Sequence, residues 1–236
     1  MRYAIAVMLI CCWIAPPVGA EIITMDTTID SPHAGGTIQI YDGPDSPTTV
    51  DVVDGAIIQS SIVVNGHSVL NIRGGRTHSF IFGRDHSTVN IFDGLVATDE
   101  DVEMEDDSVA NIYGGHFGDD IEAKDSAVVN LYGGTFEKAG GGAFLTVQGD
   151  GVINVYLREY EIMNVEGFDR LIGVLLDGSD INVIVLVDSF EPRSARIVLH
   201  TIPEPESLTL TVIMGLILSF HALTRRNRAV RRTRLR

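Results

Sequence analysis

Aromatic side chains recur at one position of a repeated phrase, and aromatic rings are groups that can hold sugars. Two residues after an asparagine, four copies of the phrase carry Phe92, Tyr113, Tyr132 and Tyr156, and the first copy carries Arg73. Such rings offer flat apolar faces and hydroxyl groups to a ligand. If the copies stack, the five residues form one row. We interpret the row as a glycan-contact ladder or, alternatively, as a stack that stabilises neighbouring strands or an adhesive contact with another protein.

Acidic side chains near the third and fourth copies have the chemistry of a metal site. Hard carboxylate oxygens are the ligands that calcium prefers. The candidate ligands are Asp106, Asp107, Asp119 and Asp120. The stretch from Gly114 to Asp119 faintly resembles a glycine-aspartate calcium repeat, but tandem copies of that repeat are missing. The alternative is a solvated acidic turn that aids solubility. We therefore expect no cofactor, with Ca²⁺ as the one candidate exception.

Two histidines occupy equivalent places in adjacent copies. His67 and His86 each lie four residues before an asparagine, so their rings could stack. Stacked surface histidines are more often a feature of turns than a ligand set. We interpret the pair as structural.

Catalysis on an acidic sugar would need a carboxylate cluster for a metal, a basic proton acceptor and an arginine for the substrate carboxylate. The bases near the acidic residues are Arg84, Lys124 and Arg158, and their spacing does not converge on a cleft. We therefore predict a protein that is not an enzyme. The alternative is a polysaccharide-acting lyase or hydrolase, because many β-helices have such activities, although a fold alone does not establish a function.

The elements that would position these residues come from internal repetition. Five copies of one phrase have their asparagines 19, 21, 19 and 24 residues apart. A period near 20 residues with β-branched residues and glycine turns is typical of a solenoid, in which each coil buries its apolar face against its neighbours. The copies are Val69–Gly75, Thr88–Gly94, Val109–Gly115, Val128–Gly134 and Val152–Tyr156.

The phase of each copy follows from the alternation of strands. Residues just before and after each asparagine are apolar, so period two directs them inward and the asparagine outward. Six residues past the asparagine, an inward position recurs as Thr77, Val96, Phe117 and Phe136. A second alternating run lies between the phrases, at Phe80 and Phe82, Val102 and Met104, Ile121 and Ala123, and Leu145 and Val147. The pattern predicts an all-β fold: a short β-solenoid of about 20 residues per coil with a β-rich C-terminal cap.

The same pattern sets the expected domain boundaries. Residues 21–66 are expected to form an irregular region with a degenerate first coil, in which Thr37–Gly43 is a copy of the phrase. Residues 67–160 are expected to form the solenoid repeats. Residues 161–202 are expected to form the cap, with an Asp-Gly turn at Asp177 and Gly178.

Residues 1–20 have the layout of a cleavable secretory signal. Arg2 precedes an apolar run from Tyr3 to Ile14, and small residues end the segment at Ala20. The partners expected at this end are the secretory translocon and signal peptidase. Cys11 and Cys12 are the only cysteines, so their removal would leave no thiol or disulfide chemistry.

Residues 203–236 combine a Pro-Glu-Pro motif, an apolar segment and an arginine-rich end. The motif is Pro203, Glu204 and Pro205; the segment spans 208–223 and predicts a single transmembrane helix. The basic tail at 225–236 indicates that this end is cytoplasmic. In this order the three elements resemble the PEP-CTERM sorting signal, which implies an exosortase as partner, cleavage near the motif and transient anchoring in the inner membrane. A simple tail anchor is the alternative.

Charge narrows the class of partner. Residues 21–202 contain thirty Asp and Glu against nine Lys and Arg, a net of −21, whereas the whole chain carries −15. Such a surface repels nucleic acid but not neutral sugars or divalent cations. The arrangement also resembles secreted repeat proteins of planctomycete-type bacteria with the same tail. We expect an exported structural or adhesive protein of the cell envelope or extracellular surface, with exopolysaccharide as a candidate partner.

Overall fold

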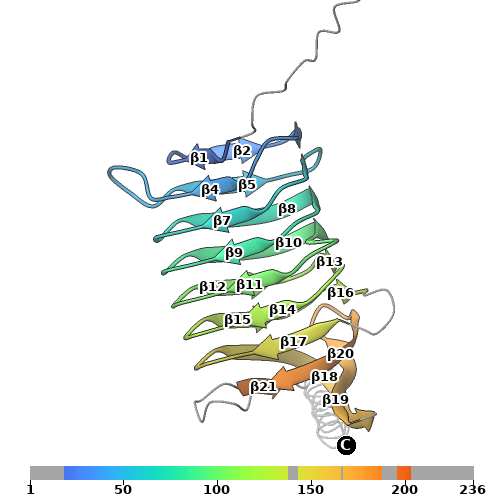
Figure 1. Ribbon diagram of the computed structural model, residues 1–236. Coiled ribbons are helices and arrows are strands. Elements are labelled where there is room, and N and C mark those ends of the chain that lie inside the picture. Colours follow the sequence, from blue (N-terminus) through green and yellow to red (C-terminus); the bar gives the residue numbers. More distant parts are fainter. Residues whose placement is uncertain (1–18, 138–142, 166, 188–195, 203–236) are drawn as a thin grey trace, which may run out of the picture. The chain divides into compact units, whose positions relative to one another are not determined.

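Strands dominate the protein. The computed structural model describes residues 19–137, 143–165, 167–187 and 196–202, and in these residues the regular elements are all strands. The chain winds through successive coils stacked as a β-solenoid of about six turns (Figure 1). The predicted all-β solenoid is therefore confirmed.

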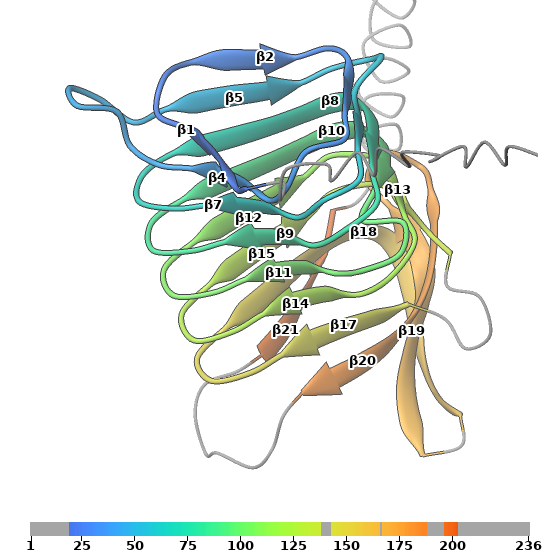
Figure 2. The same cartoon turned by 45° about the horizontal axis from the view of Figure 1, so that its top comes forward.

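Each coil contributes to three columns of parallel strands, which Figure 2 shows from the N-terminal end. We call these columns faces A, B and C, in chain order within a coil. Face A consists of β1 (Glu21–Ile23), β4 (Ile38–Ile40), β7 (Ile62–Val64), β9 (Ile81–Gly83), β11 (Val102–Met104), β14 (Ile121–Ala123) and β17 (Phe144–Val147).

Face B carries the repeated asparagine phrase. It consists of β2 (Thr27–Ile29), β5 (Thr49–Val52), the first parts of β8 (Val69–Thr77) and β10 (Thr88–Val96), β12 (Val109–Ile112), β15 (Val128–Leu131) and the start of β18 (Val152–Val165). Face C consists of β3 (Pro32–His33), β6 (Ile57–Ile58), the ends of β8 and β10, β13 (His116–Phe117) and β16 (Thr135–Phe136).

The core lies between the three faces and is built from one side of each strand. The residues flanking the asparagines, such as Ile112 and Leu131, are fully buried, as the strand phase predicts. The inward positions Thr77, Val96 and Phe117 are buried as well. Burying an Ile, Leu or Val side chain contributes roughly 1.5–3 kcal/mol, so the stacked apolar columns stabilise the coils.

The predicted phase is wrong in one strand of face A. Val102, Met104 and their equivalents in the next two coils are buried, but in β9 the inward residues are Ile81 and Gly83, not Phe80 and Phe82. Gly83 leaves a gap in the core column that the end of the Met104 side chain fills from the next coil. The two phenylalanines stack with their ring centroids 5.1 Å apart instead.

The first coils also differ from the predicted alignment. Thr37–Gly43 was expected to copy the asparagine phrase, but β4 pairs with β7 and so belongs to face A. The strand that precedes β8 on face B is β5, in which Asp51 pairs with Asn71. Residues 21–66 form β1 to β7 in regular succession, with the loop at Pro44–Pro47 between β4 and β5.

The cap combines antiparallel hairpins with a continuation of the stack. β18 pairs antiparallel with β19 (Phe168–Leu175), and β19 with β20 (Asp180–Val187) around the predicted turn at Asp177 and Gly178. β20 also pairs in parallel with β17, so face A extends into the cap. β21 (Arg196–Thr201) pairs with β18.

The predictions for the two chain ends fall mostly outside the described residues. These are the signal segment up to residue 18, the Pro203–Pro205 motif, the transmembrane segment 208–223 and the basic tail 225–236. Within the described ranges, no helix has the length and apolar character needed to cross a membrane.

Candidate functional site

The repeated asparagines form a continuous hydrogen-bonded ladder on face B. Each Nδ2 donates to the Oδ1 of the asparagine in the preceding coil, over 2.9–3.0 Å. At one end Asn71 donates to Asp51, and at the other end Asn154 accepts a hydrogen bond of 3.1 Å from Nε2 of His200. The ladder members are Asp51, Asn71, Asn90, Asn111, Asn130, Asn154 and His200.

The aromatic row lies beside this ladder, at the end of each face B strand. The ring centroids of Phe92, Tyr113, Tyr132 and Tyr156 follow one another at 5.2, 5.1 and 4.4 Å, with interplanar angles of 6–17°. The Arg73 guanidinium lies 4.6 Å from the Phe92 centroid, and the His200 ring stacks on Tyr156 at 4.6 Å. The predicted row is therefore a stacked ladder, which we call the aromatic ladder.

Stacking decides which chemical groups the aromatic ladder can offer. Interior ring faces are covered by neighbouring rings, and the outer faces are covered by Arg73 and His200. A ligand would therefore meet ring edges and hydroxyl groups, not the flat faces expected from the sequence. Phe92 and Tyr113 are the most accessible members, at 38% and 45% exposure. Burial raises the pKa of the Tyr132 phenol, and a hydrogen bond with Tyr156 raises it further. The phenol therefore stays protonated.

A shallow groove of about 450 Å³ runs along the corner between faces B and C. Its floor consists of Gly75, Gly94, Gly115 and Gly134, one from each of four successive coils. All four have positive φ, from 77° to 115°, which explains why the corner requires glycine. An aromatic residue stands two positions before Gly94, Gly115 and Gly134, but none of the ladder rings is among the residues that line the groove. Sequence reasoning missed the groove, although its glycines belong to the repeated phrase.

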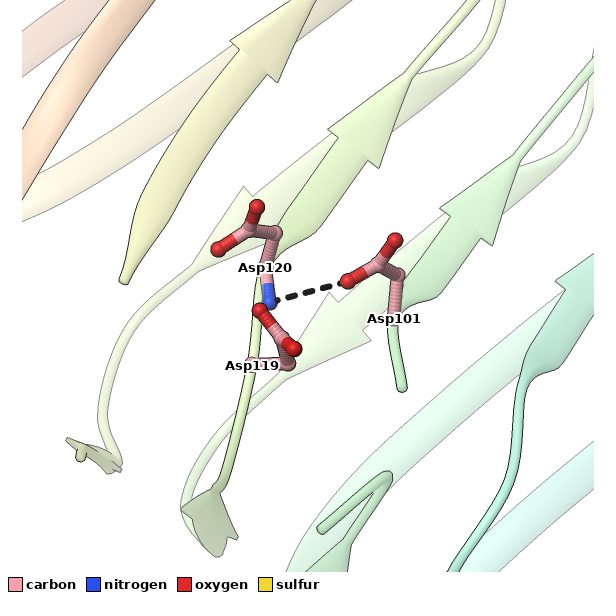
Figure 3. Close-up of side chains that lie close together, drawn as sticks. All are labelled: Asp101, Asp119 and Asp120. Carbon is pink, nitrogen blue, oxygen red and sulfur yellow. Dashed lines mark hydrogen bonds between the residues drawn. The ribbon is translucent and has the colours of Figure 1, made fainter. Parts of the chain in front are cut away.

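Two of the four calcium candidates lie together with a third carboxylate, that of Asp101, which belongs to the acidic stretch of residues 99–107. One carboxylate oxygen from each of Asp101, Asp119 and Asp120 lies within 4.8 Å of the others (Figure 3). Asp106 and Asp107 lie in a separate turn, where the Asp106 carboxylate accepts the Asp85 N–H at 3.0 Å. Whether any of these residues binds calcium stays a prediction.

The three-carboxylate cluster also has a structural role. Asp101 Oδ1 accepts the Asp120 N–H at 3.2 Å, and Asp120 Oδ1 accepts the Phe144 N–H at 2.9 Å, so each carboxylate joins one coil to the next. Burial raises the pKa of the Asp101 carboxyl to about 6, against the effect of this hydrogen bond. The charges of Asp119 and Asp120 raise it further.

The two histidine rings lie next to each other in adjacent coils, as expected, but their planes are tilted by 35°. The His67 and His86 ring centroids lie 5.2 Å apart. Nδ1 of His67 faces the Asp42 carboxylate at 3.3 Å, and Nδ1 of His86 faces that of Asp107 at 3.7 Å. This column of exposed rings and carboxylates joins turns of successive coils, which fits its interpretation as a turn feature.

Two of the three bases considered for catalysis take part in ion pairs on face A, whereas the Arg158 guanidinium donates to the Leu176 carbonyl. Arg84 and Lys124 each lie six residues before an asparagine, a shared repeat position that the sequence interpretation overlooked. Arg84 pairs with Glu105 at 2.8 Å, and Lys124 pairs with Glu103 at 2.6 Å and with Glu122 at 2.8 Å. Hydrogen bonds with both glutamates raise the pKa of Lys124 although burial opposes this, so the amine stays charged. A charged amine held by two carboxylates is poorly suited to accept a proton.

Fold and site together define a β-solenoid repeat protein with polar and aromatic ladders along one face. Compared with known proteins, the chain matches no family model, no curated protein and no solved structure. Its function therefore has to be argued from its own residues.

Proposed function

We propose that this chain is an exported structural or adhesive protein of the cell envelope and is not an enzyme. The observation that carries the proposal is the pair of ladders on face B, which extends from Asp51 to His200. The most regularly repeated outward residues contact one another between coils. The repeated outward residues therefore stabilise a rigid surface. A reaction centre would instead need different kinds of side chain that converge on one point.

In this proposal the two chain ends direct the protein to its cellular location. The signal-like segment 1–20 directs export, and the motif, apolar segment and arginines of 203–236 direct sorting by an exosortase. The acidic charge of residues 21–202 suits a soluble surface outside the cell that does not bind nucleic acid.

The ladder can be tested by replacing Tyr113 and Tyr132 together with serine in the full chain. Loss of the stacked pairs, each contributing about 0.5–1.5 kcal/mol beyond area burial, should lower the melting temperature. The matched control replaces Tyr41 and Tyr160, which are exposed tyrosines outside the ladder, with serine. Retention on the host's exopolysaccharide is measured for both variants. Lost stability with unchanged retention would rule out a binding role for the ladder, and unchanged stability would contradict its structural role.

The enzyme alternative has one observation in its favour, the mixed charges of Arg84, Glu103, Glu105, Glu122 and Lys124. It predicts that purified full-length protein releases new reducing ends or unsaturated products from the host polysaccharide, and that Lys124→Met abolishes this release. Our proposal predicts no products from either protein.

A further inference from the structure

An acidic side chain lies against each end of the corner groove, whereas backbone lies between the ends. An added Cβ at Gly74 would meet the Asp54 carboxylate, and one at Gly133 would meet the Asp177 carboxylate, so an acid fills the space at each end. At Gly94 and Gly114, between these ends, the nearest atoms are backbone atoms. The groove is thus a bounded trough and not a continuous crease of the solenoid.

The length of the trough suits a short stretch of linear polymer. Gly75 and Gly134 are three coil steps apart, which at roughly 4.8 Å per step gives about 14 Å along the stack. A volume of about 450 Å³ is within the range of ligand sites. Because the floor repeats once per coil, a ligand with a similar repeat would meet equivalent surroundings at each step.

Both walls present groups that hydrogen-bond hydroxyls. On the face C side stand Leu95, His116 and Thr135, with Nδ1 of His116 2.9 Å from the Thr135 hydroxyl. On the face B side the lining residues are Gly74 and Asp93, whose carboxylate can accept from a hydroxyl. At one end Ser179 Oγ donates to the Gly134 carbonyl and to the Asp177 carboxylate, at 2.8 and 2.6 Å.

The charge of the groove lining indicates which linear polymers could bind. Among the described residues, the groove lining includes Asp54, Asp93 and Asp177 but no Lys or Arg. Two of these carboxylates already accept internal hydrogen bonds, Asp93 from the Gly94 N–H at 2.7 Å and Asp177 from the Gly134 N–H at 3.0 Å. An anionic chain would be repelled, whereas the hydroxyls of a neutral chain can donate to the remaining carboxylate lone pairs.

We propose that this groove binds one chain of a neutral linear glycan, which lies along the stack with its hydroxyls toward the acids and toward His116, Thr135 and Ser179. The proposal rests on the adhesive function above and gives that function a ligand class and a place. It is distinct from the ladder as a contact, because the rings of the aromatic ladder are not among the residues that line the groove.

Binding is tested with the full-length protein and four series of oligosaccharides from dimer to hexamer. Two are neutral, β-1,4-linked glucose and N-acetylglucosamine; one is the cationic glucosamine series; one is an anionic uronic acid series. Affinity for a neutral series should rise with chain length and level off once the chain spans the groove. Binding of the cationic series alone, or of no neutral oligomer, would overturn the proposal.

Two matched variants locate the binding. Thr135→Arg places a long side chain on the exposed wall next to Gly134 and should weaken neutral oligomer binding by about tenfold or more. Thr28→Arg makes the same change at an exposed strand position in the first coil and should leave binding unchanged. If Thr135→Arg binds normally while the Tyr113/Tyr132 serine variant does not, the groove proposal fails and the ladder remains the contact. If both bind and are retained normally, adhesion through this corner fails altogether.

Discussion

The asparagine at the centre of each repeat joins coils through both ends of its amide. Asn111 donates to Asn90 and accepts from Asn130, at 3.0 and 2.9 Å. All the amides point the same way, so the carboxylate of Asp51 accepts at one end and the imidazole N–H of His200 donates at the other. An outward residue therefore contributes to stability here, in addition to the inward apolar residues.

The strand phase predicts different costs for neighbouring residues. Ile112→Ala should lower the free energy of unfolding by about 2–5 kcal/mol, because it leaves a cavity among fully buried side chains. Asn111→Ser should cost less, about 1–2 kcal/mol, because it breaks two ladder hydrogen bonds in a partly solvated position. Chemical denaturation of both variants measures the difference. Equal losses would contradict the assigned phase.

Burial of the Asp101 carboxyl, reinforced by the charges of neighbouring carboxylates, gives a prediction with a pH dependence. The folded-state pKa of Asp101, about 6, lies above its ordinary value of 3.8, so the folded protein binds more protons between these values. The contribution of this group to stability is therefore present at low pH and is lost as the pH rises toward 6 and above. Asp101→Asn keeps an oxygen that can accept the Asp120 N–H, so it should raise stability at pH 7 by about 1 kcal/mol, a value reduced for solvent screening.

The measurement is the melting temperature of wild type and Asp101→Asn at pH 4 and pH 7. The variants should differ at pH 7 and converge at pH 4, whereas Asp125→Asn, at an exposed turn, should differ little at either pH. If the cluster binds calcium, added Ca²⁺ raises the melting temperature of wild type but not that of Asp101→Asn. A gain for Asp101→Asn that is larger at pH 4 would refute this electrostatic account.

At the scale of the strand, the sequence predicted the orientation of a residue only where its residue type recurs at the period of the repeat. Face B was placed correctly because five asparagines fix the register and apolar neighbours fix the phase. In β9 the inward residue is Gly83, which has no hydrophobic signal, so the alternation favoured Phe82. The groove was missed for the same reason, since its floor is glycine and its ends, Asp54 and Asp177, lie outside the repeated phrase.

The packing of β9 against β11 predicts a coupling between two substitutions. Gly83→Ala should destabilise, because its added methyl would overlap the end of the Met104 side chain. Met104→Ala should also destabilise, because it empties that space. The double variant should lose less than the sum of the two, by about 0.5–3 kcal/mol, since the new methyl then has room. A double-mutant cycle in denaturant measures this term, and strict additivity would contradict the packing.

His200 in β21 forms the last contact of both ladders. It lies outside the repeated phrase, so the sequence pattern did not predict this contact. His200→Ala should remove the stack on Tyr156 and the hydrogen bond to Asn154. Hydrogen exchange should then be faster in β21 while amides in β10 and β12 keep their protection, because coils depend mainly on their neighbours. His86→Ala, which alters the other histidine stack, should leave β21 unchanged. Unaltered exchange in β21 after His200→Ala would refute its closing role.

At the scale of the whole molecule, acidic and basic residues are concentrated in different regions of the chain. Residues 21–202 carry a net charge of −21, and the seven arginines of the last segment partly offset this in the total of −15. An acidic surface suits export and solubility, and a basic end next to an apolar segment suits retention on the cytoplasmic side of a membrane. In our proposal, the C-terminal segment therefore functions as a sorting signal, and the folded coils have a different role.

The sorting proposal predicts that processing depends on the two prolines of the motif. Pro203→Ala combined with Pro205→Ala keeps the apolar segment and all seven arginines, so a simple membrane anchor would be unaffected. An exosortase that reads the motif would leave the variant uncleaved and membrane-bound. Mass spectrometry of the protein from its native host gives both termini, and fractionation gives its location. The matched control, Glu206→Gln, changes a neighbouring residue outside the motif and should be processed as wild type. Unchanged processing and delivery of the double proline variant would mean that residues 203–236 are only an anchor.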